Sequence, residues 1–180
     1  MGGIPTGWPN GSSRGGRPLG VVNAGIGGNR LLSDSPVYGE KGLSRFRRDV
    51  LERPGVRTVI VMDGVNDLAA WNETGPVTAR QIIEGLRALI GAAHARGIRV
   101  VGGTIMPMKG SAAYTGSGER IRDEVNRWIR GGGAYDSVVD FDRVVDDRGR
   151  IRALYDSGDH IHLNDTGYRA IADAVDLNTL

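Results

Sequence analysis

The sequence predicts an α/β domain in which helices cover both faces of a parallel sheet, giving three α/β/α layers. Two observations support this prediction. Apolar segments of strand length alternate with amphipathic helical patterns along residues 21–180. The clearest strand, Arg57–Asp63, is continuously apolar rather than alternating, as expected of a parallel strand covered on both faces. Strand–helix–strand repeats in one sheet make right-handed crossovers, so all strands are expected to end at the same edge.

The periodic segments define four strands and four helices. The strands are predicted at residues 21–25, 57–63, 98–105 and 137–141. The helices are predicted at residues 41–52, 78–96, 119–130 and 165–176, each with apolar residues repeating on one face. Gly97 ends the second helix, and Asn164 or Asp165 can cap the last one.

Residues 1–20 are expected to form a Gly/Pro-rich arm that precedes the α/β domain at residues 21–180. Seven of these twenty residues are Gly and three are Pro. Gly is costly to order and Pro lacks a main-chain N–H, so the segment is not a regular helix or a central strand. The arm is therefore expected to pack loosely.

The composition limits the classes of protein that remain. The 180 residues carry a formal charge of +2, 39% are hydrophobic and 24% are charged, as in an ordinary soluble domain. The arginines are dispersed, so no nucleic-acid partner is expected. The absence of Cys excludes disulfides and Cys-ligated metals, and no apolar run approaches the ~20 residues of a membrane span. The sequence has no apolar leader segment, so a cytoplasmic location is expected for it as it stands, whereas a longer form could be secreted.

Polar groups follow the first two predicted strands, at the sheet edge where α/β proteins bind ligands. Gly27 and Gly28 present unobstructed main-chain N–H groups that can bind an anion or a developing oxyanion, and Asn66 adds a side-chain amide. Asp159 and His162 lie on a loop just before the last helix. A carboxylate beside an imidazole fixes its tautomer and lets it act as a general base. Together these groups predict an acyl-transfer site that lacks only a nucleophile.

Each of these features also has a purely structural explanation. The glycines can form a tight turn, Asn66 can cap a loop, and acidic and His residues are common on exposed loops. A phosphate-binding turn is a further alternative, since Gly25, Gly27 and Gly28 loosely resemble a dinucleotide-binding loop. That alternative fails because residues 31–36 separate the glycines from the next helix. The joint occurrence of the features, in this order and after these strands, favours the catalytic interpretation.

Three segments resemble sequence blocks of the SGNH hydrolases, the GDSL-type esterases and lipases. Residues 23–29 (NAGIGGN) resemble the second block, residues 64–67 (GVND) the third, and residues 159–162 (DHIH) the fifth. The resemblance spans residues 20–176. It implies a flavodoxin-like sheet and a serine ester hydrolase that needs no metal or other cofactor. Its substrate would be a small-molecule ester, such as a carbohydrate or small acyl ester.

The resemblance also implies a role for each candidate residue. The Gly28 N–H and the Asn66 side chain would form the oxyanion hole, and Asp159 and His162 would be the Asp and His of a catalytic triad. His160, inside the same block, is interpreted as a loop residue.

The nucleophile block of the family, Gly-Asp-Ser, is not present in the sequence. Ser12 and Ser13 are the only serines before the second block, and they lie too close to Val21 for a strand and a helix to fit between. The first strand and first helix of the family are therefore expected to be missing. Three hypotheses remain open: an active ester hydrolase, a truncated and catalytically impaired family member, and a non-enzymatic module that binds anions or carbohydrates.

Overall fold

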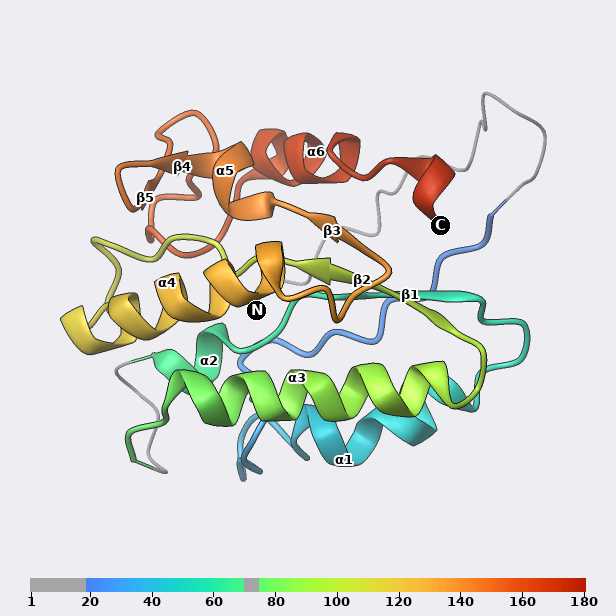
Figure 1. Ribbon diagram of the computed structural model, residues 1–180. Helices are drawn as coiled ribbons and strands as arrows, with labels where there is room; N and C mark the ends of the chain where they lie inside the picture. The colour runs from blue at the N-terminus through green and yellow to red at the C-terminus, as the bar shows by residue number, and fades with distance from the viewer. Residues whose placement is uncertain (1–18, 70–74) are drawn as a thin grey trace.

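The computed structural model describes residues 19–69 and 75–180. Helices lie on both sides of a central sheet, so the described residues form three layers (Figure 1). This arrangement confirms the predicted α/β/α architecture. The arm predicted at residues 1–20, including Ser12 and Ser13, lies outside the described residues except for Leu19 and Gly20, and its separation from the domain stays a prediction.

The central sheet contains β1 (Thr58–Val61), β2 (Arg99–Gly103) and β3 (Ser137–Val139), which pair in this order and are all parallel. These strands correspond to three of the four predicted strands. Successive side chains of β2 enter different cores: Val100 packs into the larger apolar cluster and Val101 into a smaller one on the opposite face. Burial on both faces explains the apolar sequence of β2.

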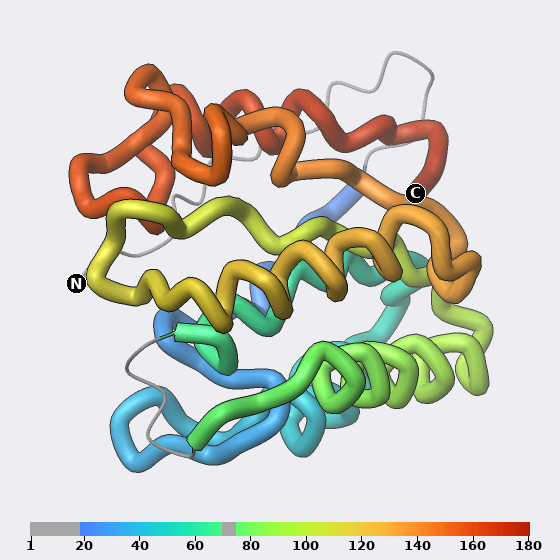
Figure 2. The backbone as a smooth tube through the Cα atoms, turned by 60° about the vertical axis from the view of Figure 1, so that its left-hand side comes forward, coloured from blue at the N-terminus to red at the C-terminus, as the bar shows by residue number. Residues whose placement is uncertain are grey.

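The predicted helices are present on the two faces of the sheet. One face carries α1 (Gly42–Phe46), its π-helical continuation η1 (Arg47–Leu51), α3 (Ala79–His94) and α4 (Gly116–Gly131). The other face carries α6 (Asp165–Asp173), and the two views agree on this placement (Figures 1 and 2). Asn164 caps α6 by accepting the Gly167 N–H at 3.0 Å. None of the helices in residues 19–69 and 75–180 is long and apolar enough to cross a membrane.

The prediction of a strand at residues 21–25 is wrong. Val21 and Val22 lie in irregular, extended chain and are 60% and 72% exposed. Within the described residues no main-chain hydrogen bond joins this segment to a neighbouring strand. A strand is stabilised by its neighbours, and an apolar sequence alone does not provide them.

Five short elements were not predicted, because each is too brief to show a repeating apolar pattern. One short helix and a small hairpin lie in the region predicted to be irregular. The other two elements are single helical turns elsewhere in the chain. The elements are α2 (Val65–Leu68), α5 (Phe141–Val145), β4 (Asp146–Asp147), β5 (Arg150–Ile151) and η2 (Leu177–Thr179).

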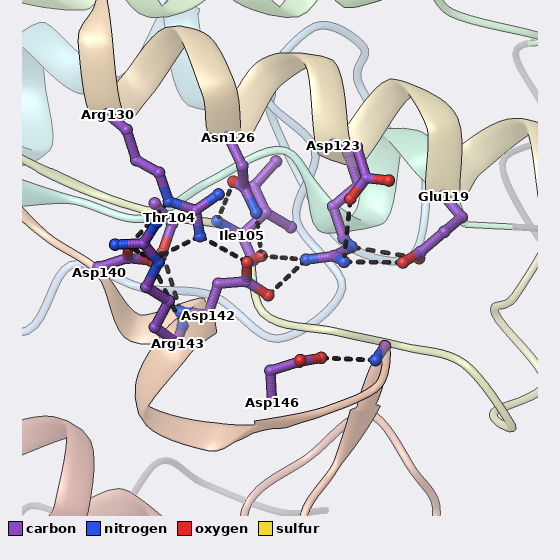
Figure 3. A network of polar contacts seen from close by, with 12 residues as sticks. Thr104, Ile105, Glu119, Asp123, Asn126, Arg130, Asp140, Asp142, Arg143 and Asp146 are labelled. Atoms are coloured by element: carbon purple, nitrogen blue, oxygen red, sulfur yellow. Dashed lines mark hydrogen bonds and ion pairs between the residues drawn. The ribbon is translucent and has the colours of Figure 1, made fainter.

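A buried polar network joins α4 to the chain that follows β2 and β3 (Figure 3). Asn126 accepts the Ile105 N–H at 2.7 Å and donates to the Ile105 C=O at 2.8 Å. The Arg122 guanidinium donates to the same carbonyl and to Asp142, and it also pairs with Glu119. These bonds satisfy main-chain groups just beyond the strand, where no β-ladder is present. The network therefore fixes the course of the chain as it leaves the sheet towards the candidate site.

Candidate functional site

Asp159 and His162 form the Asp–His pair that the sequence predicts. The Asp159 Oδ2 atom lies 2.6 Å from Nδ1 of His162. The other carboxylate oxygen accepts the main-chain N–H groups of Ile161 and His162 and the Ser157 hydroxyl. The loop therefore winds around one carboxylate, which sets the position of the imidazole ring.

The electrostatics of the pair suit an imidazole that works as a base. Partial burial opposes ionisation of Asp159, but the hydrogen bonds from the His162 ring and main chain prevail and hold the pKa of that carboxyl far below its usual range. An ionised carboxylate at Nδ1 favours the tautomer with a proton on Nδ1, which leaves Nε2 as an acceptor. The His162 side chain is 67% exposed.

The Gly28 turn needs glycine at its centre. Gly28 has φ of 75°, in the left-handed region, and a Cβ atom there would lie 2.3 Å from the Tyr38 ring. No hydrogen bond of the Gly28 N–H occurs within the described residues. The turn therefore favours glycine, and its main-chain N–H has no partner among the described residues.

Asn66 connects this turn to the carboxyl end of β1. Its side-chain amide donates to the Asn29 carbonyl at 2.9 Å, which leaves a second N–H for another acceptor. The next residue, Asp67, is buried and accepts the N–H groups of Leu31 and Leu32 at 2.8 and 2.9 Å. The two predicted oxyanion donors are therefore parts of one hydrogen-bonded unit.

Sequence reasoning missed two residues that hold this unit in place. Arg45, on α1, donates to the Asn29 side chain at 2.8 Å and to the Ala24 carbonyl at 2.6 Å. Asn29 in turn donates to the carbonyls of Tyr38 and Glu40. The sequence contains no signal for Arg45, because helical periodicity places it opposite the apolar face of the predicted helix.

His160 belongs to a second Asp–His pair on the same loop. Its Nδ1 lies 2.5 Å from Oδ2 of Asp156, and Oδ1 of the same carboxylate accepts the N–H groups of Gly158 and His160. His160 adopts φ of 64°, which is uncommon for a residue other than Gly. The pair agrees with the interpretation of His160 as a loop residue, because these bonds stabilise an unfavourable backbone conformation.

The two halves of the site lie at the same edge of the sheet. α2, which contains Asn66, and the loop that leads into α6 both lie at the end of the molecule towards which the strands run (Figure 1). Ile161 packs against the larger apolar cluster, which also contains Leu31 and Leu68. No hydrogen bond within the described residues joins His162 to Asn66. Their action on one substrate therefore stays a prediction.

The surface hollows lie away from this edge. Two hollows, of about 440 and 500 Å³, lie along α4 and are lined by residues such as Arg127 and Gly131. The hollows contain none of the predicted site residues, whereas the Asp159 side chain is 50% exposed. Within residues 19–69 and 75–180, no three His, Asp or Glu side chains gather in a way that could hold a metal ion.

Asp63, between β1 and Asn66, leads to a prediction about pH. Burial raises the pKa of the Asp63 carboxyl to about 6. The hydrogen bond that this carboxyl accepts from the Gly64 N–H lowers the pKa, but by less than burial raises it. A raised folded-state pKa stabilises the fold below the unfolded pKa of about 4, and this stability is lost between about pH 4 and 6. The variant Asp63→Asn should therefore be about 1–2 kcal/mol more stable than the parent at pH 7 and equal to it at pH 4.

Urea unfolding of both proteins at the two pH values measures this difference. Asp34→Asn is the matched control, since the Asp34 side chain is exposed. An equal gain at both pH values would contradict the ionisation argument.

The described residues combine a parallel three-layer fold with an Asp–His pair at the carboxyl edge of the sheet. Comparison with known proteins identifies the class of protein: the pattern of the GDSL-like lipase/acylhydrolase family matches residues 3–170. The chain belongs to this family, whose members are hydrolases of the lipase and esterase kind. No curated protein sequence matches the chain.

Solved structures of the same kind share the fold. A GDSL-like lipase from Bacteroides thetaiotaomicron is 20% identical, with a TM-score of 0.61 over 76% of this chain and 68% of that one. A lipolytic G-D-S-L protein from Desulfitobacterium hafniense is 24% identical, with a TM-score of 0.58 over 74% and 70% of the two chains. An acetyl xylan esterase is 21% identical, with a TM-score of 0.62 over 84% and 76%. These similarities confirm the fold.

Proposed function

We propose that this chain carries the base and oxyanion-hole portion of a serine ester hydrolase. The observation that carries the proposal is the pairing of Asp159 with Nδ1 of His162 at 2.6 Å on an exposed side chain. Such a pair can accept a proton from a hydroxyl, because the carboxylate stabilises the imidazolium that forms.

The proposed reaction follows the usual course of acyl transfer. His162 Nε2 takes the proton of a serine hydroxyl as its oxygen attacks the ester carbon. The Gly28 N–H and the free N–H of Asn66 stabilise the negative charge that develops on the carbonyl oxygen. His162 then protonates the departing alcohol. In the second half of the reaction His162 takes a proton from the water that attacks the acyl-enzyme, and it returns a proton to the serine as the acid is released.

The substrate class is a small-molecule ester, including esters of carbohydrates and short acyl groups. One structural relative is an acetyl xylan esterase, which supports carbohydrate esters as the first substrates to test. The competing proposal, a non-enzymatic module that binds anions or carbohydrates, would use the Gly28 and Asn66 donors alone.

The expected activity of the 180-residue chain is weak or absent. Ser12 and Ser13 are the only serines before the second block, and the Gly- and Pro-rich sequence around them supplies few apolar groups to anchor either one. An unanchored hydroxyl loses the orientation that makes attack fast, so turnover should stay within about tenfold of background.

Hydrolysis of a short-chain aryl ester by the chain, by His162→Ala and by Ser12→Ala/Ser13→Ala tests this expectation. Robust turnover that is lost in both variants would mean that one of these serines is the nucleophile. Turnover lost only in His162→Ala would mean that another nucleophile is used. Turnover that is unaffected by His162→Ala would refute the proposed base.

A further inference from the structure

We infer that Asp156 and His160 are positioning residues for the Asp159–His162 pair. Their own pairing holds the loop in the shape that brings the Asp159 carboxylate to Nδ1 of His162. The inference rests on the proposed function, in which His162 is the base, and it gives a role in the reaction to two residues beyond the base and its carboxylate.

The first Asp–His pair encloses the residue that carries the second carboxylate. Oδ1 of Asp156 accepts the N–H groups of Gly158 and His160 at 2.8 and 3.0 Å, and Oδ2 lies 2.5 Å from Nδ1 of His160. Asp159 lies between Gly158 and His160 in the chain. The main chain on both sides of Asp159 is therefore bound to one carboxylate, which limits the directions in which the Asp159 side chain can point.

His160 supplies the reversal of chain direction that the second pair requires. Asp159 accepts the N–H groups of Ile161 and His162 at 3.1 and 2.8 Å, so the chain must turn back immediately after residue 159. His160 makes this turn with φ of 64°, in the left-handed region that residues other than Gly adopt at a cost in free energy. The pairing of its imidazole with Asp156 offsets this cost. Loss of the pairing should therefore loosen the turn that places His162 beside Asp159.

Asp156 is anchored to the body of the domain, whereas Asp159 is not. The Asp156 side chain is 8% exposed, and its main chain pairs with that of the buried Leu163 in an antiparallel bridge. Its carbonyl also accepts the side-chain amide of Asn164, the residue that caps α6. The Asp159 side chain is 50% exposed, and within residues 19–69 and 75–180 its carboxylate hydrogen-bonds only to residues of the same loop. The position of Asp159 relative to α6 therefore depends on Asp156 and His160.

The test measures the tautomer of His162 from the nitrogen NMR shifts of its imidazole, at about pH 9, where an unperturbed imidazole is neutral. Pairing of Nδ1 with Asp159 favours the tautomer with the proton on Nδ1. This measurement needs neither a nucleophile nor a substrate. A protein that has this tautomer but hydrolyses no ester would contradict the proposed function and leave the positioning inference intact.

Two variants of His160 separate the pairing from the mere presence of a side chain. His160→Ala removes the partner of Asp156 and disfavours the left-handed conformation. His160→Asn keeps both features, because Asn tolerates that conformation and its amide nitrogen takes the place of Nδ1. His94→Ala is the control, since it removes an Asp–His pair on α3, in which Nε2 of His94 lies 2.9 Å from Asp136.

The ratio of the Nδ1-protonated to the Nε2-protonated tautomer of His162 should fall by about fivefold in His160→Ala, which corresponds to the net contribution of one hydrogen bond. His160→Asn should restore most of the parental ratio, and His94→Ala should leave it unchanged. Unchanged amide shifts of β2 show in each variant that the fold is intact.

A parental ratio in His160→Ala would overturn the inference. So would an equal fall in His94→Ala, or no recovery in His160→Asn. A parental protein in which His162 already favours the proton on Nε2 would overturn both the inference and the proposed base.

Discussion

Ester hydrolysis is expected to rise by about 10³-fold or more when a strand ending in Gly-Asp-Ser is joined upstream of residue 1. The chain already contains the paired Asp159 and His162 and the donors of Gly28 and Asn66. Under the proposed function, a base without an anchored nucleophile cannot form an acyl-enzyme, so a supplied hydroxyl should have the largest single effect on the rate. The measurement is the initial rate of hydrolysis of a short-chain aryl ester.

The matched control ends in Gly-Asp-Ala, which keeps the strand and removes only the hydroxyl. A second control combines Gly-Asp-Ser with His162→Ala and should return to the rate of the Gly-Asp-Ala protein. A gain that survives His162→Ala would refute the role proposed for this imidazole. If the Gly-Asp-Ser protein is no faster than the Gly-Asp-Ala protein, the hydrolase proposal fails.

Replacement of the buried Arg122 is expected to destabilise the fold by about 3 kcal/mol, as removal of one partner from a buried ion pair typically does. The Arg122 side chain is 4% exposed and donates to Asp142, Glu119 and the Ile105 carbonyl. In Arg122→Met the apolar stem is retained, but the guanidinium that satisfies these oxygens is lost.

Urea unfolding measures this change, and Arg120→Met on the exposed side of the same helix is the control. Arg120 lies at the surface, so its replacement should alter stability by less than about 0.5 kcal/mol. A loss in Arg122→Met no larger than that of the control would mean that the network contributes nothing to stability.

The sequence determined the parts of this protein that depend on local pattern. The apolar periodicity of α3, α4 and α6 and the continuous apolar sequences of β1 and β2 predicted these elements and their order. The Asp159–His162 pair was equally predictable, because both residues lie within one short loop and the carboxylate bonds to nearby N–H groups. Asn66 could be assigned to the carboxyl edge because it directly follows a strand.

Only the tertiary structure decided the features that depend on contacts between distant segments. Residues 21–25 have the sequence of a strand but form none, and Val21 and Val22 are exposed, since pairing requires a neighbour that the described residues do not supply. The bonds from Arg45 to Ala24 and from Asn66 to Asn29 likewise join residues more than 20 positions apart. Local patterns carry information about residues that are close in the chain, whereas these bonds form only when the packed sheet and helices bring remote segments together.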